Sequence, residues 1–263
     1  MDPSTMDKMK REFIRSLQVT PEQIQQIMQV EQRTDAWFEA RKNRLTGSVY
    51  GAAAGHNKYM SPRKLLMELL WSSFKGNKAT QHGTKYEPVA AKAYETFITQ
   101  HEKKKCVFYY PGLVVSPDHP WIAGSPDGLP LLGMMHILLE IKCPFYRSSY
   151  PFIPHYYYDQ IQGIMGILRL PYCDFFTWSL ECIQIRRFAF DRSYWERVLF
   201  PRLRSFYMDE YLPRIILKRE GLLRPGELEP VIQISYYEPT MPCPLIEDEQ
   251  RPQKKARIAL DDP

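Results

Sequence analysis

The fold of this chain is restricted most strongly by two short segments, residues 125–128 (Ser-Pro-Asp-Gly) and 139–144 (Leu-Glu-Ile-Lys-Cys-Pro). Residues two apart in a strand point to the same face, so Glu140 and Lys142 are expected to project together. The proline and glycine beside Asp127 predict a turn, after which the chain can return as an adjacent antiparallel strand that places Asp127 opposite Glu140. Facing carboxylates repel unless a cation lies between them, and hard oxygen ligands suit magnesium or manganese. The two segments therefore predict a metal-assisted hydrolysis site.

Each segment alone also has an ordinary structural explanation. An Asp-Gly pair is common in turns, and a Glu-x-Lys pattern is common on solvated strand faces. Residues 137–141, however, form an almost continuous apolar run of the kind found in buried strands. Burying charged side chains in such a strand costs free energy unless they are paired, so the two segments together favour a functional site.

With their neighbours, the two segments resemble the PD-(D/E)XK nuclease signature in the form used by the phage lambda exonuclease and YqaJ-type viral recombinase family. Further motifs of that family are matched, in the expected order, by residues 37–48 (Trp-x-x-x-Arg, then Leu-Thr-Gly-Ser), 82–90 (Gly-x-x-x-Glu) and 157–162 (Tyr-x-x-Gln-x-Gln). The resemblance spans residues 37–165. It implies an α/β (α+β) fold with a restriction-endonuclease-like core, in which helices flank a central mixed β-sheet.

The resemblance also implies roles for the residues of these motifs. Asp127, Glu140 and the main-chain carbonyl of Ile141 are expected to hold a divalent metal, Mg²⁺ or Mn²⁺. Glu87 is expected to complete the metal shell or to support a second metal. Lys142 is expected to position the attacking hydroxide and to offset charge that develops on the phosphate.

Four further residues are candidates for catalysis or DNA binding. Gln160 lies at the edge of an apolar stripe on a predicted helix, where its amide can orient the attacking water or a carboxylate ligand, or bind nearby backbone instead. Arg41 and Ser48 have an alternative as a surface ion pair and a helix cap, but the resemblance implies that they hold the phosphate of a terminal nucleotide. Tyr157 belongs to the Gln160 motif and is a candidate DNA contact.

Composition sets the outer limits. The 263 residues are 44% apolar, enough for one well-packed domain, and no run approaches the length of a membrane span. The five cysteines are odd in number and include no Cys-x-x-Cys pair, so neither a disulfide framework nor a zinc site is expected. A net charge of +5 is compatible with nucleic acid but does not require it. The six histidines, at positions 56, 82, 101, 119, 136 and 155, show no ligand spacing, and none is expected to be catalytic.

Hydrophobic periodicity and turn residues divide the chain into helices and strands. Helices are predicted over residues 21–32, around 37–41, 46–54, 61–70, 84–99, 155–168 and 192–218. Strands are predicted over 106–110, 113–115, 121–123, 137–142, 174–179 and 182–188. We expect Pro88 in the first turn of its helix, breaks at Pro201 and Pro213, and a close approach of the 155–168 helix to the sheet at Gly163 and Gly166. The predicted domains are 1–33 (N-terminal helical extension), 34–238 (nuclease domain) and 239–263 (flexible basic tail).

The resemblance implies a 5′-to-3′ exonuclease that acts on duplex DNA ends in viral or mobile-element recombination or replication. A structure-selective or nicking endonuclease and a non-catalytic DNA-binding module are the alternatives. A single-strand annealing protein and a homo-oligomeric ring trimer are the implied partners. The absence of an apolar signal segment predicts an intracellular protein without a membrane. The basic cluster 251–257 is either a nuclear import signal or solvated charge, in which case the cytoplasm is expected.

Overall fold

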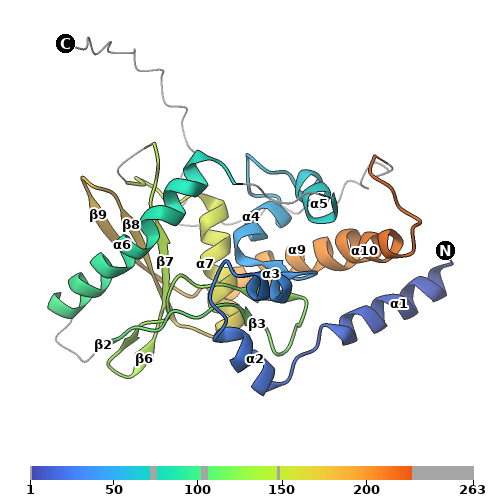
Figure 1. The fold of residues 1–263 in the computed structure, drawn as a ribbon, viewed down its shortest axis with the longest axis horizontal. Coiled ribbons are helices and arrows are strands. Elements are labelled where there is room, and N and C mark those ends of the chain that lie inside the picture. The colour runs from blue at the N-terminus through green and yellow to red at the C-terminus, as the bar shows by residue number, and fades with distance from the viewer. Residues whose placement is uncertain (1, 72–75, 102–105, 147–148, 227–263) are drawn as a thin grey trace, which may run out of the picture.

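The computed structural model describes residues 2–71, 76–101, 106–146 and 149–226 (Figure 1). Its α-helices are α1 (Pro3–Ser16), α2 (Pro21–Met28), α3 (Asp35–Arg41), α4 (Tyr50–Ala53), α5 (Pro62–Trp71), α6 (Lys78–His101), α7 (His155–Leu168), α8 (Arg192–Tyr194), α9 (Phe200–Ser205) and α10 (Leu212–Arg219). A 3₁₀ turn, η1 (Gly47–Val49), and two π-helical segments, η2 (Trp195–Leu199) and η3 (Phe206–Tyr211), complete the helical elements. The strands are β1 (Leu45–Thr46), β2 (Cys106–Val107), β3 (Val114–Val115), β4 (Ile122–Gly124), β5 (Leu131–Leu132), β6 (Met135–His136), β7 (Leu138–Lys142), β8 (Tyr172–Trp178) and β9 (Ile183–Ala189).

The described strands form three small sheets, ordered β1-β4-β3, β2-β5-β6 and β7-β8-β9. The last is mixed, because β7 pairs with β8 in parallel and β8 pairs with β9 antiparallel. The predicted class, a mixed sheet flanked by helices, is confirmed, although the strands are divided among three sheets. An antiparallel bridge between Gly128 and Leu139 joins the turn that follows Asp127 to β7.

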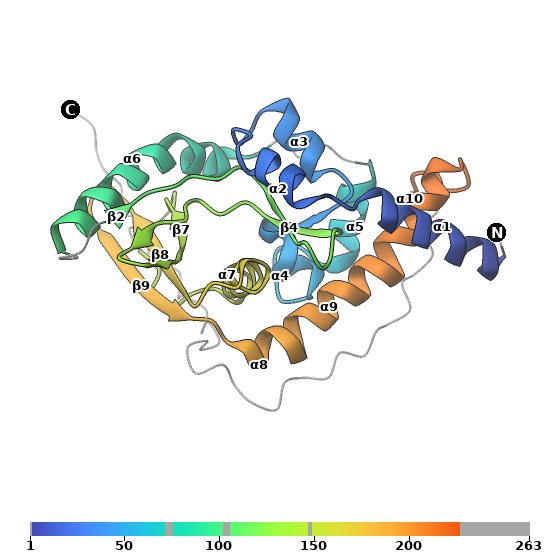
Figure 2. The same cartoon turned by 90° about the horizontal axis from the view of Figure 1, so that it is seen from below.

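The β7-β8-β9 sheet lies between two helices, α6 and α7, which pack on opposite faces (Figure 2). Leu139 and Ile141 of β7 belong to the apolar cluster that contains Tyr94 of α6. Leu138 belongs to the cluster that contains Ile164 of α7. Because the side chains of a strand alternate between faces, Glu140 and Lys142 must face α7.

A buried polar group fastens α6 to the sheet. Asp174 of β8 is fully buried and accepts two hydrogen bonds from Arg187 of β9, at 2.7 and 2.9 Å. Tyr94 of α6 donates to the same carboxylate at 2.8 Å. A buried carboxylate that is fully paired resists displacement, because removing one partner leaves an uncompensated charge. Glu87 lies two turns before Tyr94, so this contact also sets the position of Glu87.

Two of the predicted helices differ from the structure at their prolines. The helix predicted over 84–99 begins earlier, at Lys78, and contains Pro88 in its interior. The segment from α8 to α10 is not broken at Pro201 or Pro213, since helical elements follow one another from Arg192 to Arg219. The π-helical segments η2 and η3 end shortly before these prolines, and their wider turns accommodate residues that cannot donate a main-chain hydrogen bond.

The glycines of α7 allow close approach to aromatic rings, in contrast to the predicted approach to the sheet. A Cβ added at Gly163 would lie 2.4 Å from Cδ2 of Tyr50, and one added at Gly166 would lie 2.6 Å from Cδ2 of Trp195. The approach of α7 to the sheet depends instead on Gly124 of β4, where an added Cβ would lie 3.0 Å from a side-chain carbon of α7.

The N-terminal helices pack on the body of the protein. Phe13 and Leu17, in and just after α1, join the core cluster that contains Leu212 and Ile216 of α10, and Figure 1 shows α1 and α10 side by side. α2 contacts β3. The predicted tail 239–263 and its basic cluster lie outside the described residues, and the predicted domain division stays a prediction.

We expect Gly163→Ala to destabilise the protein by about 2 kcal/mol, the usual cost of overpacking a core. Tyr50 cannot move aside easily, because it is fully buried and its hydroxyl donates to the carbonyl of Ala123 at 2.6 Å. Gly83→Ala in α6 is the matched control, since an added Cβ there meets nothing within 4 Å. The control should be stabilised by up to about 1 kcal/mol, because alanine favours a helix more than glycine does. Urea denaturation of both variants measures the difference, and equal stabilities would contradict the prediction.

Candidate active site

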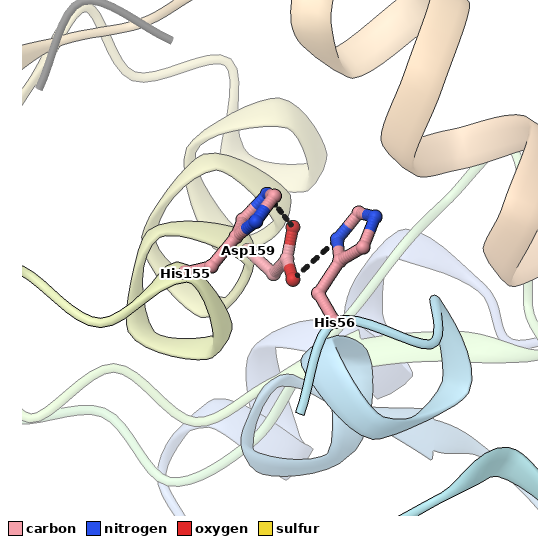
Figure 3. Close-up of side chains that lie close together, drawn as sticks. All are labelled: His56, His155 and Asp159. Carbon is pink, nitrogen blue, oxygen red and sulfur yellow. Dashed lines mark hydrogen bonds and ion pairs between the residues drawn. The ribbon is translucent and has the colours of Figure 1, made fainter. Parts of the chain in front are cut away.

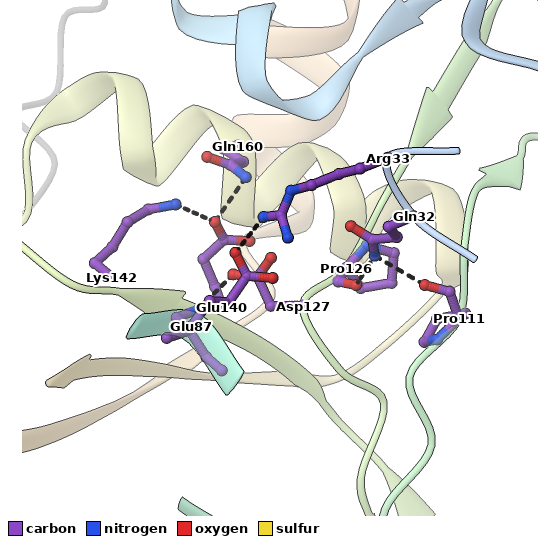
Figure 4. Close-up of polar contacts among 10 residues, drawn as sticks. Gln32, Arg33, Glu87, Pro111, Pro126, Asp127, Glu140, Lys142 and Gln160 are labelled. Carbon is purple, nitrogen blue, oxygen red and sulfur yellow. Dashed lines mark hydrogen bonds and ion pairs between the residues drawn. The ribbon is translucent and has the colours of Figure 1, made fainter. Parts of the chain in front are cut away.

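β7 delivers an acid and a base to the face covered by α7. Glu140 is fully buried, forms an ion pair with Lys142, and accepts a hydrogen bond from the amide of Gln160 at 2.7 Å (Figure 4). The same oxygen, Oε1, receives both contacts. The predicted convergence of these three side chains is observed, and Gln160 binds the carboxylate, not nearby backbone.

Asp127 faces Glu140 from the neighbouring segment, as the turn signal predicts. Its Oδ2 accepts a hydrogen bond from the main-chain N–H of Ile141 at 2.7 Å. The turn before it is fastened by Gln32, whose amide donates to the carbonyls of Pro111 at 2.9 Å and Pro126 at 3.0 Å. Asp127 is therefore held beside β7 by main-chain contacts on both sides.

The two carboxyl groups have strongly altered acidity. Burial raises the pKa of Asp127 well above its ordinary value, and the negative charges of Glu140 and Glu87 raise it further. Burial likewise raises the pKa of Glu140, against the effect of Lys142. For Lys142 burial acts in the opposite direction, but the charges of Glu140 and Asp127 outweigh it and raise its pKa. A cation placed here would favour the ionised form of both acids.

One oxygen of this cluster is available to such a cation. Oε2 of Glu140 is buried and has no hydrogen-bond partner among the described residues. An unpaired carboxylate oxygen in a protein interior is costly, and Asp127 lies beside it as a second hard oxygen donor. These residues fit a divalent metal of the magnesium type.

Glu87 reaches this cluster from α6. Its charge contributes to the raised pKa of both Asp127 and Glu140, which places it near them. Its Oε2 forms an ion pair with Arg33 at 2.5 Å. Arg33 is not among the predicted site residues, because nothing in the sequence links it to Glu87, which follows 54 residues later.

Arg41 lies in a second polar group beside the first. Its guanidinium stacks on the ring of Trp37 with 4.1 Å to the ring centre and donates to the hydroxyls of Ser125 at 3.2 Å and Thr46 at 2.7 Å. Burial lowers the pKa of Arg41 to about 10. Because Ser125 is two residues before Asp127, this group adjoins the acidic cluster. Ser48 is exposed in η1, and its side chain is not among the hydrogen-bond partners of Arg41 in the described part of the chain.

The ring of Tyr157 lies beside the ammonium group of Lys142. The ammonium of Lys142 is 4.8 Å from the centre of its ring, and its hydroxyl lies 3.4 Å from that of Tyr150. Burial raises the pKa of Tyr157, so its hydroxyl keeps its proton. The structure thus places all the predicted side chains except Ser48 in direct contact with another residue of the site region, while their roles stay predictions.

Residues 36–168, half of the chain, match the YqaJ-like viral recombinase domain. The chain belongs to this family. It is 30% identical over 175 residues to an uncharacterized protein of Acanthamoeba polyphaga mimivirus, and this match covers 60% of the chain and 31% of the viral protein. The chain therefore spans less than a third of the length of that relative.

The fold of this YqaJ-like protein is similar to the crystal structures of the alkaline exonuclease LHK-Exo from Laribacter hongkongensis, including the one in complex with dAMP. The TM-score is 0.56 at 23% identity, and the similarity covers 72% of the chain and all of LHK-Exo. The predicted family and fold class are confirmed. In the described part of the chain, no helix is both long and apolar enough to span a membrane.

The YqaJ-like protein has a second polar cluster, at the start of α7 (Figure 3). His56, His155 and Asp159 have ligand atoms within 4.8 Å of one another, a spacing that permits a metal ion. The predictions made from the sequence do not include this cluster. The four-residue spacing of His155 and Asp159 on a predicted helix was the available signal.

The hydrogen bonds of this cluster favour a structural network over a metal centre. Arg202 donates to Nε2 of His56 at 3.1 Å, so Nδ1 carries the proton that His56 donates to Asp159 at 3.0 Å. Tyr194 donates to the other oxygen of Asp159 at 2.5 Å and accepts from His155 at 2.8 Å. A metal would have to displace these protons and approach the cation of Arg202. The two imidazole rings are also stacked, 4.0 Å apart, and cannot direct their lone pairs to one point.

We expect Asp127→Asn to raise the stability of the protein in the presence of a chelator, on the order of 1 kcal/mol at pH 8. The folded-state pKa of Asp127 is raised, so the folded state binds more protons than the unfolded state above the ordinary pKa, and stability falls as pH rises. The gain from asparagine should therefore shrink as pH falls toward 4. Thermal melts across this range measure it.

The matched control for this prediction is Asp118→Asn. Asp118 is exposed and pairs with Arg169 at 2.9 Å on the surface. Its substitution should change stability by less than about 0.5 kcal/mol at any pH tested. If Asp127→Asn were less stable than the unmutated protein at pH 8, the buried negative charge of Asp127 would not destabilise the folded state as we infer.

Proposed function

We propose that this protein is a Mg²⁺- or Mn²⁺-dependent deoxyribonuclease that degrades one strand of duplex DNA from a 5′ end, in the recombination or replication of a virus or mobile element. The observation that carries the proposal is the convergence of Asp127 and Lys142 on Glu140, a buried carboxylate whose Oε2 has no hydrogen-bond partner among the described residues. Its membership of the YqaJ-like family supports DNA as the substrate, and the dAMP complex of LHK-Exo supports a nucleotide product.

Asp127, Glu140 and the carbonyl of Ile141 would hold the metal, with Glu87 as a further ligand. When bound, the metal lowers the pKa of its water and stabilises negative charge on the phosphate. Lys142 would hold the attacking hydroxide by a charged hydrogen bond and offset charge on the phosphate oxygens. Gln160 donates to Oε1 of Glu140, so Oε2 would be the oxygen that binds the metal.

The group around Arg41 would bind the 5′ phosphate. Its guanidinium donates to the neutral hydroxyls of Ser125 and Thr46, and such contacts leave its full charge for an anionic ligand. Ser48, exposed near β1, is proposed as a second donor to the same phosphate, and Tyr157 as a base or sugar contact beside Lys142. The finer proposals of a ring trimer, a strand-annealing partner and a nuclear location rest on the resemblance and on residues outside the described ranges.

The alanine variants of Asp127, Glu140 and Lys142 should each lose cleavage of linear duplex DNA by about a hundredfold or more. Each removes a ligand of the metal or the partner of the hydroxide, while DNA binding should be largely kept. Initial rates with Mg²⁺ measure the effect, and chelator should remove the remaining activity. Asp118→Ala, which removes an exposed carboxylate, should cleave like the unmutated protein. Near-normal turnover in any of the three variants would exclude that residue from the chemistry.

Duplexes with a 5′ phosphate should be degraded about tenfold faster than those with a 5′ hydroxyl. Arg41→Ala should remove this preference. Because Arg41 acts through positioning, its variant should retain slow cleavage that Asp127→Ala lacks. Lys42→Ala removes the neighbouring exposed charge and should keep the preference. Equal rates on both ends in the unmutated protein, together with cleavage of circular DNA, would favour the endonuclease alternative.

A further inference from the structure

Arg33 reaches the acidic cluster from a loop that lies outside the segment 37–165 covered by the family motifs. The loop joins α2 to α3, and Arg33 has a φ of 72° within it, a conformation that few non-glycine residues adopt. The preceding residue, Gln32, is bonded to the carbonyls of Pro111 and Pro126, and Thr34 caps α3. The backbone of Arg33 is therefore fixed on both sides, next to the turn that holds Asp127 (Figure 4).

The side chain of Arg33 is only partly used by its partner. One terminal nitrogen bonds Oε2 of Glu87 at 2.5 Å, while 44% of the side chain stays exposed. A guanidinium has five N–H donors in a planar fork, so an edge held by a carboxylate can leave other donors for a second anion. Arg33 thus has exposed donors beside the acidic cluster that its partner does not use.

The charges of the cluster identify the second anion. With a cation bound and the acids ionised, Asp127, Glu140 and Glu87 would carry three negative charges against the one positive charge of Lys142, which leaves an excess of two. A divalent metal would balance this excess. A phosphodiester adds one further negative charge, and Arg33 is the cation already present at the cluster that would balance it.

We propose that Arg33 is a substrate-binding residue that contacts a phosphate of the DNA strand at the metal site, with Glu87 holding its guanidinium in place. This inference rests on the proposed nuclease function. It deepens that function by adding a second phosphate contact, distinct from the one assigned to Arg41.

A competing role has the opposite consequence. If Arg33 served only as a counterion of Glu87, it would compete with the metal for that carboxylate. Its removal would then tighten metal binding and leave DNA binding unchanged. Metal affinity and DNA affinity, measured separately, distinguish the two roles.

The test uses Arg33→Ala, Arg33→Lys and the matched control Arg169→Ala. Arg169 also has a positive φ, of 55°, and also forms an exposed ion pair, with Asp118 at 2.9 Å. The control therefore reproduces the change in charge, backbone preference and surface pairing. Thermal melts establish whether each variant is folded. If Arg33→Ala does not fold, Arg33→Lys still tests the inference.

DNA affinity is measured by fluorescence anisotropy in Ca²⁺, which we expect to support binding without efficient cleavage. Arg33→Ala should bind labelled duplex about fivefold to tenfold more weakly. The slope of the logarithm of its binding constant against the logarithm of salt concentration should be smaller by about one, as expected for the loss of one phosphate contact. The DNA affinity of Arg33→Lys should lie between those of Arg33→Ala and the unmutated protein, because lysine keeps the positive charge but lacks the planar fork of donors. Arg169→Ala should stay within about twofold of the unmutated protein. Mn²⁺ affinity without DNA, measured by calorimetry, should not rise in Arg33→Ala.

Unchanged DNA affinity in Arg33→Ala relative to Arg169→Ala would overturn the inference, and so would a rise in Mn²⁺ affinity without a loss of DNA affinity. Cleavage by the unmutated protein in Mg²⁺ separates this failure from a failure of the proposed function. If the unmutated protein cleaves DNA and Arg33→Ala binds DNA with normal affinity, only the role of Arg33 is refuted. A protein that neither binds nor cleaves DNA refutes both proposals.

Discussion

Glu140 is a fully buried carboxylate on an apolar strand, and the surrounding structure compensates for the cost of burying it. Lys142 pairs with one of its oxygens, and Gln160 donates to the same oxygen from α7. The other oxygen has no partner among the described residues and lies beside Asp127. Burial and the negative charges of Glu140 and Glu87 raise the pKa of Asp127. A site of this kind is unstable as a purely structural feature. The divalent metal that we propose would bind this oxygen and remove the cost of burying it unpaired.

Both helices that cover the sheet serve this cluster through contacts outside it. Tyr94 and the buried Asp174 hold α6, and with it Glu87, against β8. The network around Asp159 holds the first turn of α7, next to Gln160, and joins it to the segment after α4 and to α9. Because α7 carries Gln160 on one side and Asp159 on the other, an anchor without catalytic chemistry fixes the orientation of a residue in the site.

The features that the sequence predicted are those encoded over a few residues. The alternation of side chains in β7 was sufficient to place Glu140 and Lys142 on one face, and the turn residues placed Asp127 opposite them. The family motifs then identified Glu87 and Gln160. The π-helical segments were missed because proline was taken to end a helix, whereas a wider turn before Pro201 retains the helical path.

The features that the sequence did not predict join residues distant in the chain. Arg33 and Glu87 are 54 residues apart, Arg41 and Ser125 are 84 apart, and His56 and Asp159 are 103 apart. No periodicity links such pairs, because their contact depends on how β4, β7 and α7 assemble. The motif residues thus define the chemistry locally, whereas the cations that surround it are supplied by loops and helix ends. Recognition of the substrate is therefore expected to vary among proteins that share the same acidic centre, since loops tolerate change more readily than a buried strand does.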